Sequence, residues 1–385
     1  MRRIVHVFWS LTFGGIETML INIANAQAEM GADVSVVIVN DMVEPVLLHS
    51  FSKRVKVLLM KRKVGSRNIL PFLCLNKTLL GLHPDAIHLH ESDLFGCLWF
   101  KRLSRVTSVT LHALPFGMVR REGLLYKLLH HGKYEEKGNV ENIDKIPRVF
   151  AISKAVHDML LDRYHINSVV VNNGIKTETF LQRESTEWHK PLRVIQVGRL
   201  DHEKKGQDLL IDATSQLKGT IDVTFIGDGN SMDFLKQSVK TQGVDDFVHF
   251  LGKQDQSFIA KNLYKYDLFV QASRWEGFGL TVAEAMAAKV PVLVSEGQGP
   301  AEVTCGEKYG WLFRNGDSSE LAKQIRHIML NRTDALSKAE SACRYVQETY
   351  DVSVTARKYL DNYPYVSSAH PTKSVAELNQ NTNDI

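Results

Sequence analysis

The chain has 385 residues, of which 44% are hydrophobic and 23% charged, and its net charge is +4. This composition excludes an intrinsically disordered chain, and the length exceeds what one hydrophobic core usually holds, so we expect two folded domains. The four cysteines lack CxxC or zinc-ligand spacing, and they suit packing residues in a reducing compartment.

No apolar run approaches the roughly 18 to 20 residues that a membrane-spanning helix needs, and the N-terminal apolar stretch is too short for a signal peptide. We therefore expect a cytoplasmic protein. Residues 1–185 carry a net charge of +7 and the remainder −3. Lys53–Arg67 holds seven basic residues and no acidic one. It can contact an anionic membrane, such as the inner face of the cell membrane, at about 1 kcal/mol per basic residue. Equally, it can be a solvated strand and loop.

The N-terminal residues predict a strand, a loop and a helix in succession. The apolar run 3–9 indicates a buried strand, and helical spacing of apolar residues follows from Ile16 to Ala24. Residues 34–39 predict the next strand, which completes a βαβ unit. Its first turn contains Gly14 and Gly15, where open parallel sheets bind ligands. The pair lacks the GxGxxG spacing of dinucleotide sites, but two glycines let a substrate approach the backbone closely.

Histidines mark the next two predicted strands. Residues 85–90 place His88 and His90 on one face, and His112 ends a further strand before a Pro/Gly loop. No third ligand stands at ligand spacing, so we expect no metal site. His112 can bind a hydroxyl in an interdomain cleft, or it can be a hydrogen-bonded core histidine. Residues 120–145 predict an amphipathic helix and a mobile loop near an acceptor.

The polar residues 184–191 predict a linker, after which strands and helices alternate again. The predicted fold is α/β, with two Rossmann-like domains whose parallel sheets face a central cleft. The N-terminal domain covers residues 1–183 and the C-terminal domain residues 192–350. A helix at 351–366 can pack back on the N-terminal domain, and the polar tail 367–385 is predicted to be disordered.

The stretch 271–291 contains the strongest candidate site. An apolar strand is followed by Glu276, by the turn Gly277-Phe278-Gly279 and by a helix that starts near Leu280 and contains Glu284. If Thr281 or a neighbour caps this helix, its free N–H groups form an anion site at the turn. Two carboxylates then flank a phosphate or diphosphate, as the hydroxyls of a nucleotide sugar require. The alternative is an ordinary strand-loop-helix unit with solvated carboxylates.

A basic pair lies after the first strand of the C-terminal half. Arg199 ends the strand VIQVGRL, and Lys205 follows six residues later. A guanidinium and an ammonium over one loop can bind a diphosphate through charge-assisted hydrogen bonds. The alternative is a basic surface loop.

Together these motifs resemble the retaining glycosyltransferases with two Rossmann-type domains, called group 1 or family four, which have the GT-B fold. The resemblance covers most of the chain in the right order. The matching segments are GGIET at 14–18, TLHALPFG at 110–117, AISK at 151–154, NNGI at 172–175, VGRL with KKG at 197–206, IGDG at 226–229, FLGK at 250–253, EGFGLTVAEAM at 276–286 and GPAEV at 299–303. Two segments depart from the family pattern: Asn172-Asn173-Gly174 replaces Pro-Asn-Gly, and GDGN replaces GDGP.

The resemblance implies roles for the candidate residues. Glu276 would bind hydroxyls of the donor sugar, and Glu284 would bind the ribose. Arg199 and Lys205 would neutralise the diphosphate leaving group. His112 would contact the donor sugar near the reacting carbon. The loop 14–15 would border the donor phosphates and the acceptor.

The resemblance also implies the reaction. We expect a metal-independent, retaining hexosyltransferase that needs no cofactor and moves a sugar from a nucleotide diphosphate sugar to a hydroxyl of a saccharide acceptor. UDP-sugars are favoured over GDP-mannose, and the acceptor is expected to be lipid-linked, in surface polysaccharide or glycolipid synthesis. No nucleic-acid partner is expected. The alternatives are a nucleotide-sugar epimerase of the same architecture and a non-catalytic carbohydrate-binding module. A nicotinamide-dependent dehydrogenase is disfavoured because the full glycine fingerprint is missing.

Overall fold

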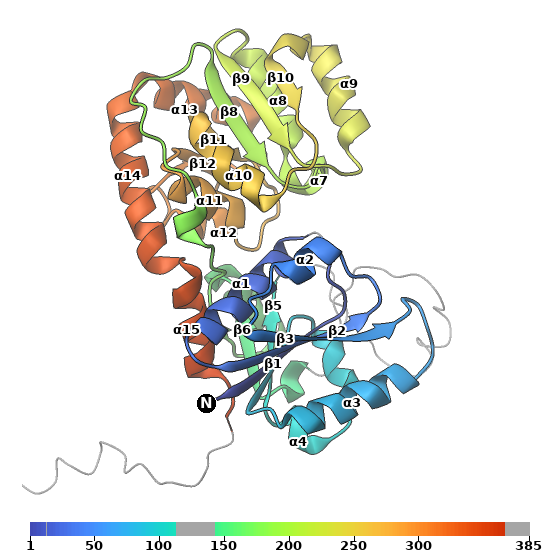
Figure 1. Cartoon of the computed structure of the whole chain (residues 1–385). Helices are drawn as coiled ribbons and strands as arrows, with labels where there is room; N and C mark the ends of the chain where they lie inside the picture. Colours follow the sequence, from blue (N-terminus) through green and yellow to red (C-terminus); the bar gives the residue numbers. More distant parts are fainter. Residues whose placement is uncertain (13, 113–142, 366–385) are drawn as a thin grey trace, which may run out of the picture.

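The computed structural model describes residues 1–12, 14–112 and 143–365. In these residues the chain forms two α/β domains, one above the other in Figure 1, with the N-terminal domain below. The disordered tail predicted at 367–385 lies outside the described residues, and so does nearly all of the amphipathic helix and loop predicted at 120–145.

The N-terminal domain is built on a parallel sheet of order β3-β2-β1-β4-β5-β6-β7. Its central strands are buried, as their apolar sequences predict, whereas the edge strands β3 and β7 are partly exposed. The strands are β1 (Arg3–Phe8), β2 (Asp33–Asn40), β3 (Val55–Arg62), β4 (Ala86–Leu89), β5 (Thr107–Leu111), β6 (Arg148–Ala151) and β7 (Val169–Val170). The helices described in this domain are α1 (Gly15–Glu29), α2 (Pro45–His49), α3 (Leu70–Leu82), α4 (Lys101–Ser104) and α6 (Lys154–Tyr164).

The C-terminal domain has a second parallel sheet, of order β10-β9-β8-β11-β12-β13. Its strands are β8 (Leu192–Val197), β9 (Ile221–Ile226), β10 (Val248–Phe250), β11 (Leu268–Gln271), β12 (Val292–Ser295) and β13 (Trp311–Phe313). Its helices are α7 (His202–Lys205), α8 (Gln207–Gln216), α9 (Met232–Gln242), α10 (Gln256–Asn262), α11 (Leu280–Ala287), α12 (Gly299–Val303), α13 (Ser318–Leu330) and α14 (Arg332–Thr349). The prediction of two Rossmann-like domains is confirmed.

The end of the chain returns to the first domain. Helix α14 packs against α11, and α15 (Val352–Asn362) then packs against α1. Figure 1 shows these last helices descending along one side from the upper domain to the lower. Tyr359 and Tyr363 anchor α15, since both side chains are buried beside the N-terminal sheet.

The segment between the two sheets is fixed by a buried ion pair. The Arg183 guanidinium lies 2.8 Å from the Asp267 carboxylate, and both side chains are almost completely buried. Asp267 also accepts hydrogen bonds from the backbone N–H groups of His189 and Arg193. Among the described residues, no helix is long and apolar enough to cross a membrane.

Candidate functional site

The glutamate loop, residues 272–279, connects β11 to α11. Gly279 is the N-cap of α11 in a left-handed conformation, with φ 102°. The cap is therefore not Thr281 itself but a glycine two residues before it. Thr281 is the second residue of the helix, and its hydroxyl donates to the Gln271 side chain at 3.2 Å. The first N–H groups of α11 still lack an intrahelical acceptor, because that follows from helix geometry whichever residue is the cap. The anion-binding end of the helix remains.

Helix α12 packs directly on the glutamate loop. The Glu276 backbone N–H donates to the Gln298 side chain at 3.2 Å, and its carbonyl accepts from the Gly299 N–H at 3.0 Å. A Cβ at Gly299 would lie 2.5 Å from the backbone of Gly277 and Phe278, so only glycine permits this approach. The Phe278 side chain is buried in the core. It therefore cannot contact a ligand, and only its backbone borders the turn.

Lys205 and Glu276 form an ion pair across two loops. Lys205 ends the lysine loop, residues 198–205, which follows β8. Gly206 comes next with φ 64°, and a Cβ there would lie 2.0 Å from the Ala272 carbonyl oxygen. Glycine therefore lets the lysine loop lie against the end of β11. The two charged side chains, 24% and 21% exposed, meet at the surface of this junction.

An Arg274–Asp208 pair joins the same two loops, and the sequence alone gave no signal for it. The Arg274 guanidinium donates two hydrogen bonds to the Asp208 carboxylate, at 2.8 and 2.7 Å, and a third to the His202 carbonyl. The Arg274 backbone N–H also donates to the Lys204 carbonyl at 2.8 Å. The bidentate geometry makes this a specific pair. It fixes the position from which Lys205 reaches Glu276.

Arg199 lies on the lysine loop but does not join this pair. Its side chain is exposed, and its guanidinium has no ion-pair partner among residues 1–12, 14–112 and 143–365. Its carbonyl accepts a hydrogen bond from Gln207 at 2.8 Å, which holds the backbone. The backbone of Arg199 is therefore fixed, and its exposed guanidinium can bind an anion on the same loop as Lys205.

Glu284 lies one turn inside α11 and is 6% exposed. Its Oε1 accepts a hydrogen bond from the Gln256 side chain at 2.7 Å. Its Oε2 is buried and has no partner in the part of the chain that the structure describes. Burial raises the pKa of Glu284 to about 7, against the opposing effect of the Gln256 hydrogen bond. Like Arg274 and Asp208, Gln256 is a residue of the site that the sequence did not predict.

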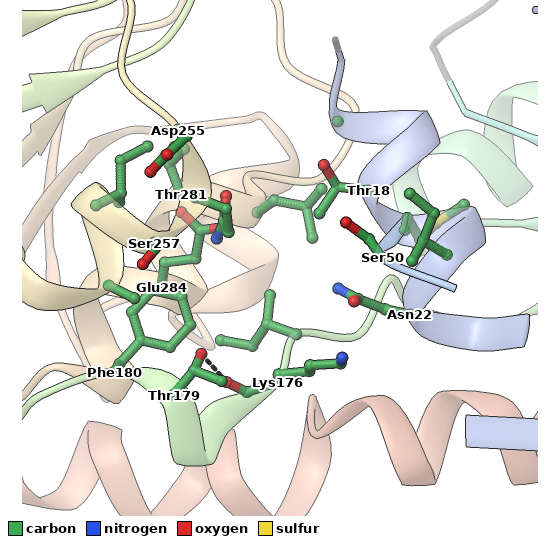
Figure 2. Close-up of a pocket in the computed structure, with 18 of the residues that line it drawn as sticks. Thr18, Asn22, Ser50, Lys176, Thr179, Phe180, Asp255, Ser257, Thr281 and Glu284 are labelled. Atoms are coloured by element: carbon green, nitrogen blue, oxygen red, sulfur yellow. Dashed lines mark hydrogen bonds between the residues drawn. The ribbon is translucent and has the colours of Figure 1, made fainter. Parts of the chain in front are cut away.

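A pocket with a volume of about 850 Å³ lies between the two domains and includes Glu284. Figure 2 shows side chains of α1 on one side and of α10 and α11 on the other. The predicted site residues that line it are Gly14, Gly15, Leu280 and Glu284. A Cβ at Gly15 would lie 3.6 Å from Leu280 Cδ1, which shows how closely the domains approach here. The pocket therefore brings the Gly14-Gly15 turn together with Leu280 and Glu284, whereas Glu276, Lys205, Arg199 and His112 are not among its lining residues.

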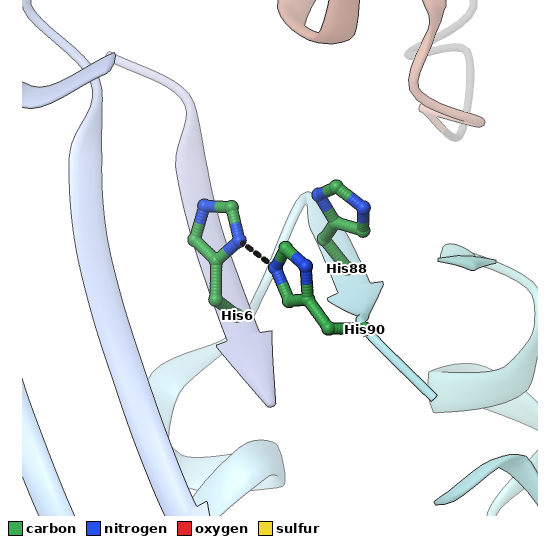
Figure 3. A group of neighbouring side chains, drawn as sticks. All are labelled: His6, His88 and His90. Atoms are coloured by element: carbon green, nitrogen blue, oxygen red, sulfur yellow. Dashed lines mark hydrogen bonds between the residues drawn. The ribbon is translucent and has the colours of Figure 1, made fainter. Parts of the chain in front are cut away.

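The predicted histidines form a buried cluster with His6 (Figure 3). Ligand nitrogens of His6, His88 and His90 lie within 4.8 Å of one another, which is close enough for a metal ion. These nitrogens are engaged in hydrogen bonds instead. His6 bonds to His90 at 3.1 Å and to Gln27 at 2.9 Å. His88 bonds to Tyr363 at 2.9 Å and to Thr110 at 2.7 Å.

His112 ends this chain of hydrogen bonds. Its Nε2 lies 3.4 Å from His90 Nδ1, while its own Nδ1 has no partner among the described residues. Burial lowers the pKa of His6 to about 4 and of His112 to about 3, and the pKa values of His88 and His90 fall well below the usual range. The cluster is therefore neutral at pH 7. His88 and His90 are hydrogen-bonded core histidines, which is the alternative that the sequence left open for His112.

Comparison with known proteins agrees with this architecture. A family model described as "Glycosyltransferase Family 4" matches residues 13–179, and one described as "Glycosyl transferases group 1" matches residues 178–348. The two matches are consecutive and follow the two sheets. The chain belongs to the group 1 glycosyltransferases.

Individual relatives are 26% and 30% identical to the chain over the aligned residues. It is 30% identical to the amylovoran biosynthesis glycosyltransferase AmsK of Erwinia amylovora over 49% of this chain and 48% of AmsK, so it spans about half of that relative. It is 26% identical to N-acetyl-alpha-D-glucosaminyl L-malate synthase of Bacillus anthracis, over 71% of each chain. The crystal structure of Anabaena HepE, in complex with UDP and glucose, superposes with a TM-score of 0.75 at 22% identity, covering 94% of this chain and 99% of HepE. That similarity shows the GT-B fold.

Proposed function

We propose that the protein transfers a sugar from a nucleotide diphosphate sugar, with a UDP-sugar favoured, to a hydroxyl of a saccharide acceptor. The observation that carries the proposal is the arrangement around α11. The N-terminus of α11 lies between a lysine-paired Glu276 and a buried Glu284 whose Oε2 has no partner among the described residues. This order of groups matches sugar hydroxyls, diphosphate and ribose hydroxyls.

The proposed reaction needs no side-chain base and no metal. The bond from the anomeric carbon to the diphosphate oxygen breaks, and the acceptor oxygen bonds to that carbon on the same face, so the configuration is retained. The departing diphosphate takes the acceptor proton. Lys205, Arg199 and the start of α11 stabilise the negative charge that develops on the diphosphate. Glu276 holds the sugar hydroxyls through the carboxylate that Lys205 orients.

His112 suits a contact with the sugar because it is neutral. Its Nε2 is turned toward His90, and its Nδ1 has no partner among the described residues. An imidazole nitrogen of this kind can accept a hydrogen bond from a sugar hydroxyl without adding charge beside the reacting carbon. The neutral state follows from burial, which lowers the pKa of His112 to about 3.

A thermal-shift screen tests the donor class first. UDP, GDP and their sugar conjugates would be compared, since a ligand at 100 times its Kd stabilises the folded state by about 2.7 kcal/mol. The selected donor is then incubated with saccharide acceptors, and NMR of the product gives the anomeric configuration. Retained configuration without added metal and in the presence of EDTA supports the proposal. Isomerised donor without acceptor would indicate an epimerase, and binding without turnover would indicate a non-catalytic module.

We also propose that the acceptor is lipid-linked and that Lys53–Arg67 contacts an anionic membrane. This segment forms the edge strand β3 and the loop after it. Its basic side chains are exposed except that of Arg62, which is partly buried and donates to Asn40 and Ser66. Val64 within the segment, and Ile69 and Leu70 just beyond it, are more than half exposed. Basic and apolar groups together favour a headgroup surface.

Vesicle sedimentation tests this contact. The protein should bind phosphatidylglycerol vesicles and not phosphatidylcholine vesicles, and K61E/K63E should release it. The matched control K236E/K240E changes the same number of charges on α9 of the other domain and should still bind. Equal binding by both double variants would exclude a role for this segment.

A further inference from the structure

Three sequence motifs that have no role in the proposed chemistry meet at one interdomain contact. They are AISK at 151–154, NNGI at 172–175 and GPAEV at 299–303. The first two belong to the N-terminal domain, and the third forms α12 of the C-terminal domain. Glu302 in α12 is the residue that joins them.

The Glu302 carboxylate accepts hydrogen bonds from the start of α6. The Lys154 backbone N–H lies 2.9 Å from Oε1 and 2.8 Å from Oε2, and the Ala155 N–H lies 3.4 Å from Oε2. The N-cap residue, Ser153, accepts from the Val156 N–H at 3.2 Å, so Glu302 serves N–H groups that the cap leaves open. Hydrogen bonds from helix N–H groups to a carboxylate are charge-assisted, and the helix dipole strengthens them.

A residue that departs from the family pattern adds to the contact. Asn172 stands where the family resemblance expects proline. Its side-chain amide donates to Glu302 Oε1 at 3.3 Å and to the Ile152 carbonyl at 3.1 Å. Proline has no side-chain donor and could make neither bond. The departure from the family motif therefore gives Glu302 an additional partner in the N-terminal domain.

The other end of α12 supports the glutamate loop. Gly299 donates to the Glu276 carbonyl, and Gln298 accepts from the Glu276 N–H. Pro300 contacts Gly279, where a Cβ would lie 3.1 to 3.4 Å from the proline ring. Helix α12 thus contacts the backbone of Glu276 at one end and the start of α6 at the other. It spans the two domains in five residues.

We propose that Glu302 is a positioning residue that fixes the glutamate loop relative to the N-terminal domain. Its hydrogen bonds to α6 and Asn172 set the distance between α12 and the N-terminal domain, and with it the position of Glu276. The interdomain contact stands on this geometry alone, whereas its effect on Glu276 chemistry rests on the proposed function. Loss of Glu302 should free the loop to move with the C-terminal domain.

Hydrogen exchange measures the contact without any substrate. In the full-length protein, E302A should speed exchange of the Lys154 and Ala155 amides at least tenfold, and N172A should speed it less. The matched control is E307Q, which alters an exposed glutamate five residues further on and should leave both amides unchanged. E302Q keeps one acceptor oxygen and serves as the milder variant if E302A folds poorly. Unchanged protection of both amides in E302Q and E302A would overturn the proposal.

Kinetics and binding then test the positioning role. With the UDP-sugar that the wild type turns over, kcat of E302A should fall at least tenfold, because Glu276 is misplaced. The Kd for UDP alone should change less than twofold, because its predicted contacts on α11 lie within the C-terminal domain. Faster amide exchange with unchanged kcat would overturn the positioning role and leave only a structural contact. A wild type that turns over no donor would refute the proposed function, while the exchange experiment would still decide the contact.

Discussion

The two walls of the interdomain cleft are built from different chemistry. On the C-terminal side, Lys205 pairs with Glu276 and Arg274 with Asp208, while Arg199 has no ion-pair partner among the described residues. The N-terminal side contributes Lys176 and the backbone of Gly14 and Gly15 to the pocket, and a buried histidine cluster that is neutral at pH 7 lies within the same domain. The ion pairs are therefore concentrated on the C-terminal side, next to the glutamate loop.

This difference follows from what each wall must bind. A nucleoside diphosphate carries its charge in one place, so one domain can hold it with cations and a helix N-terminus. The sugar and the incoming acceptor are neutral at the reacting centre. A neutral imidazole such as that of His112 and free backbone groups can fix hydroxyl positions without adding charge beside the reacting carbon.

The largest effect is expected from removing the charge of the C-terminal wall. K205A should lower kcat about a thousandfold, because a cation that stabilises leaving-group charge contributes about 3 to 4 kcal/mol to the barrier. E276A should lower it by a similar factor through loss of the sugar contact. Steady-state kinetics with the selected donor measures both, with circular dichroism to show that the fold is intact.

Lys204 provides the control for this experiment. It is the neighbouring lysine on α7, exposed and with the same side chain. K204A should retain at least half of the wild-type kcat. A K205A variant with full turnover would contradict the assignment of the basic pair.

The next effect concerns Glu284, the buried carboxyl group on α11. Its pKa of about 7 exceeds the ordinary 4.5, so the folded protein binds this proton more tightly than the unfolded chain does. Stability from this group is complete below pH 4.5 and is lost as the pH rises through 7. By pH 8 the loss reaches at most about 3 kcal/mol. E284Q cannot ionise, so it should be more stable than the wild type at pH 8 by up to that amount.

Urea unfolding at pH 5 and pH 8 measures this difference. The two proteins share all other titrating groups, so the change in their stability difference with pH belongs to Glu284. The same substitution should weaken UDP binding, because an amide accepts hydrogen bonds from ribose hydroxyls less strongly than a carboxylate. A stability difference that does not change with pH would show that Glu284 is ionised in the folded protein below pH 5.

Much of the fold and part of the candidate site were predictable from local sequence. The expected strands at 3–9 and 34–39 correspond to β1 and β2, and the helix expected to start near Leu280 begins there as α11. Hydrophobic periodicity and glycine positions depend on a few neighbouring residues, so they can be read directly. The same local pattern brought Glu276, the turn and Glu284 to attention.

What sequence did not predict depends on contacts between distant residues. Asp208 and Arg274 are 66 positions apart, and Gln256 and Glu284 are 28 apart. No spacing rule connects them, since only the packing of α7, α8 and α10 around β11 brings them together. The sequence placed the cap of α11 only near Thr281, because the exact start depends on the backbone at Gly279, which turns in a left-handed conformation that glycine adopts without strain.

The buried histidine cluster should lower the stability of the protein in acid. Burial holds the pKa of His6 near 4, below the ordinary 6.5, so the unfolded chain takes up a proton that the folded protein refuses. Its stabilising contribution is complete above pH 6.5 and is lost as the pH falls toward 4. At pH 5 the loss is about 2 kcal/mol for this histidine. H6F should therefore lose about 2 kcal/mol less stability than the wild type between pH 7 and pH 5.

Urea unfolding at the two pH values gives this slope independently of any stability lost through the substitution itself. An equal change in unfolding free energy for H6F and the wild type would mean that the cluster takes up protons while folded. That result would contradict a histidine cluster that is neutral in the folded protein.

The smallest effect on stability and the sharpest test of the glycine backbone come from one methyl group. A Cβ at Gly15 would make an ordinary contact with Leu280, at 3.6 Å, and Gly15 is the first residue of α1. G15A should leave stability unchanged or raise it by about 0.5 to 1 kcal/mol, as alanine does in helices. If donor phosphates approach this backbone, the methyl group should lower kcat/KM for the nucleotide sugar about tenfold. G81A is the matched control, since Gly81 lies in α3 with no atom within 4 Å of its Cβ position. It should gain similar stability and keep full activity, whereas full activity in G15A would show that the N-terminal wall touches the donor elsewhere.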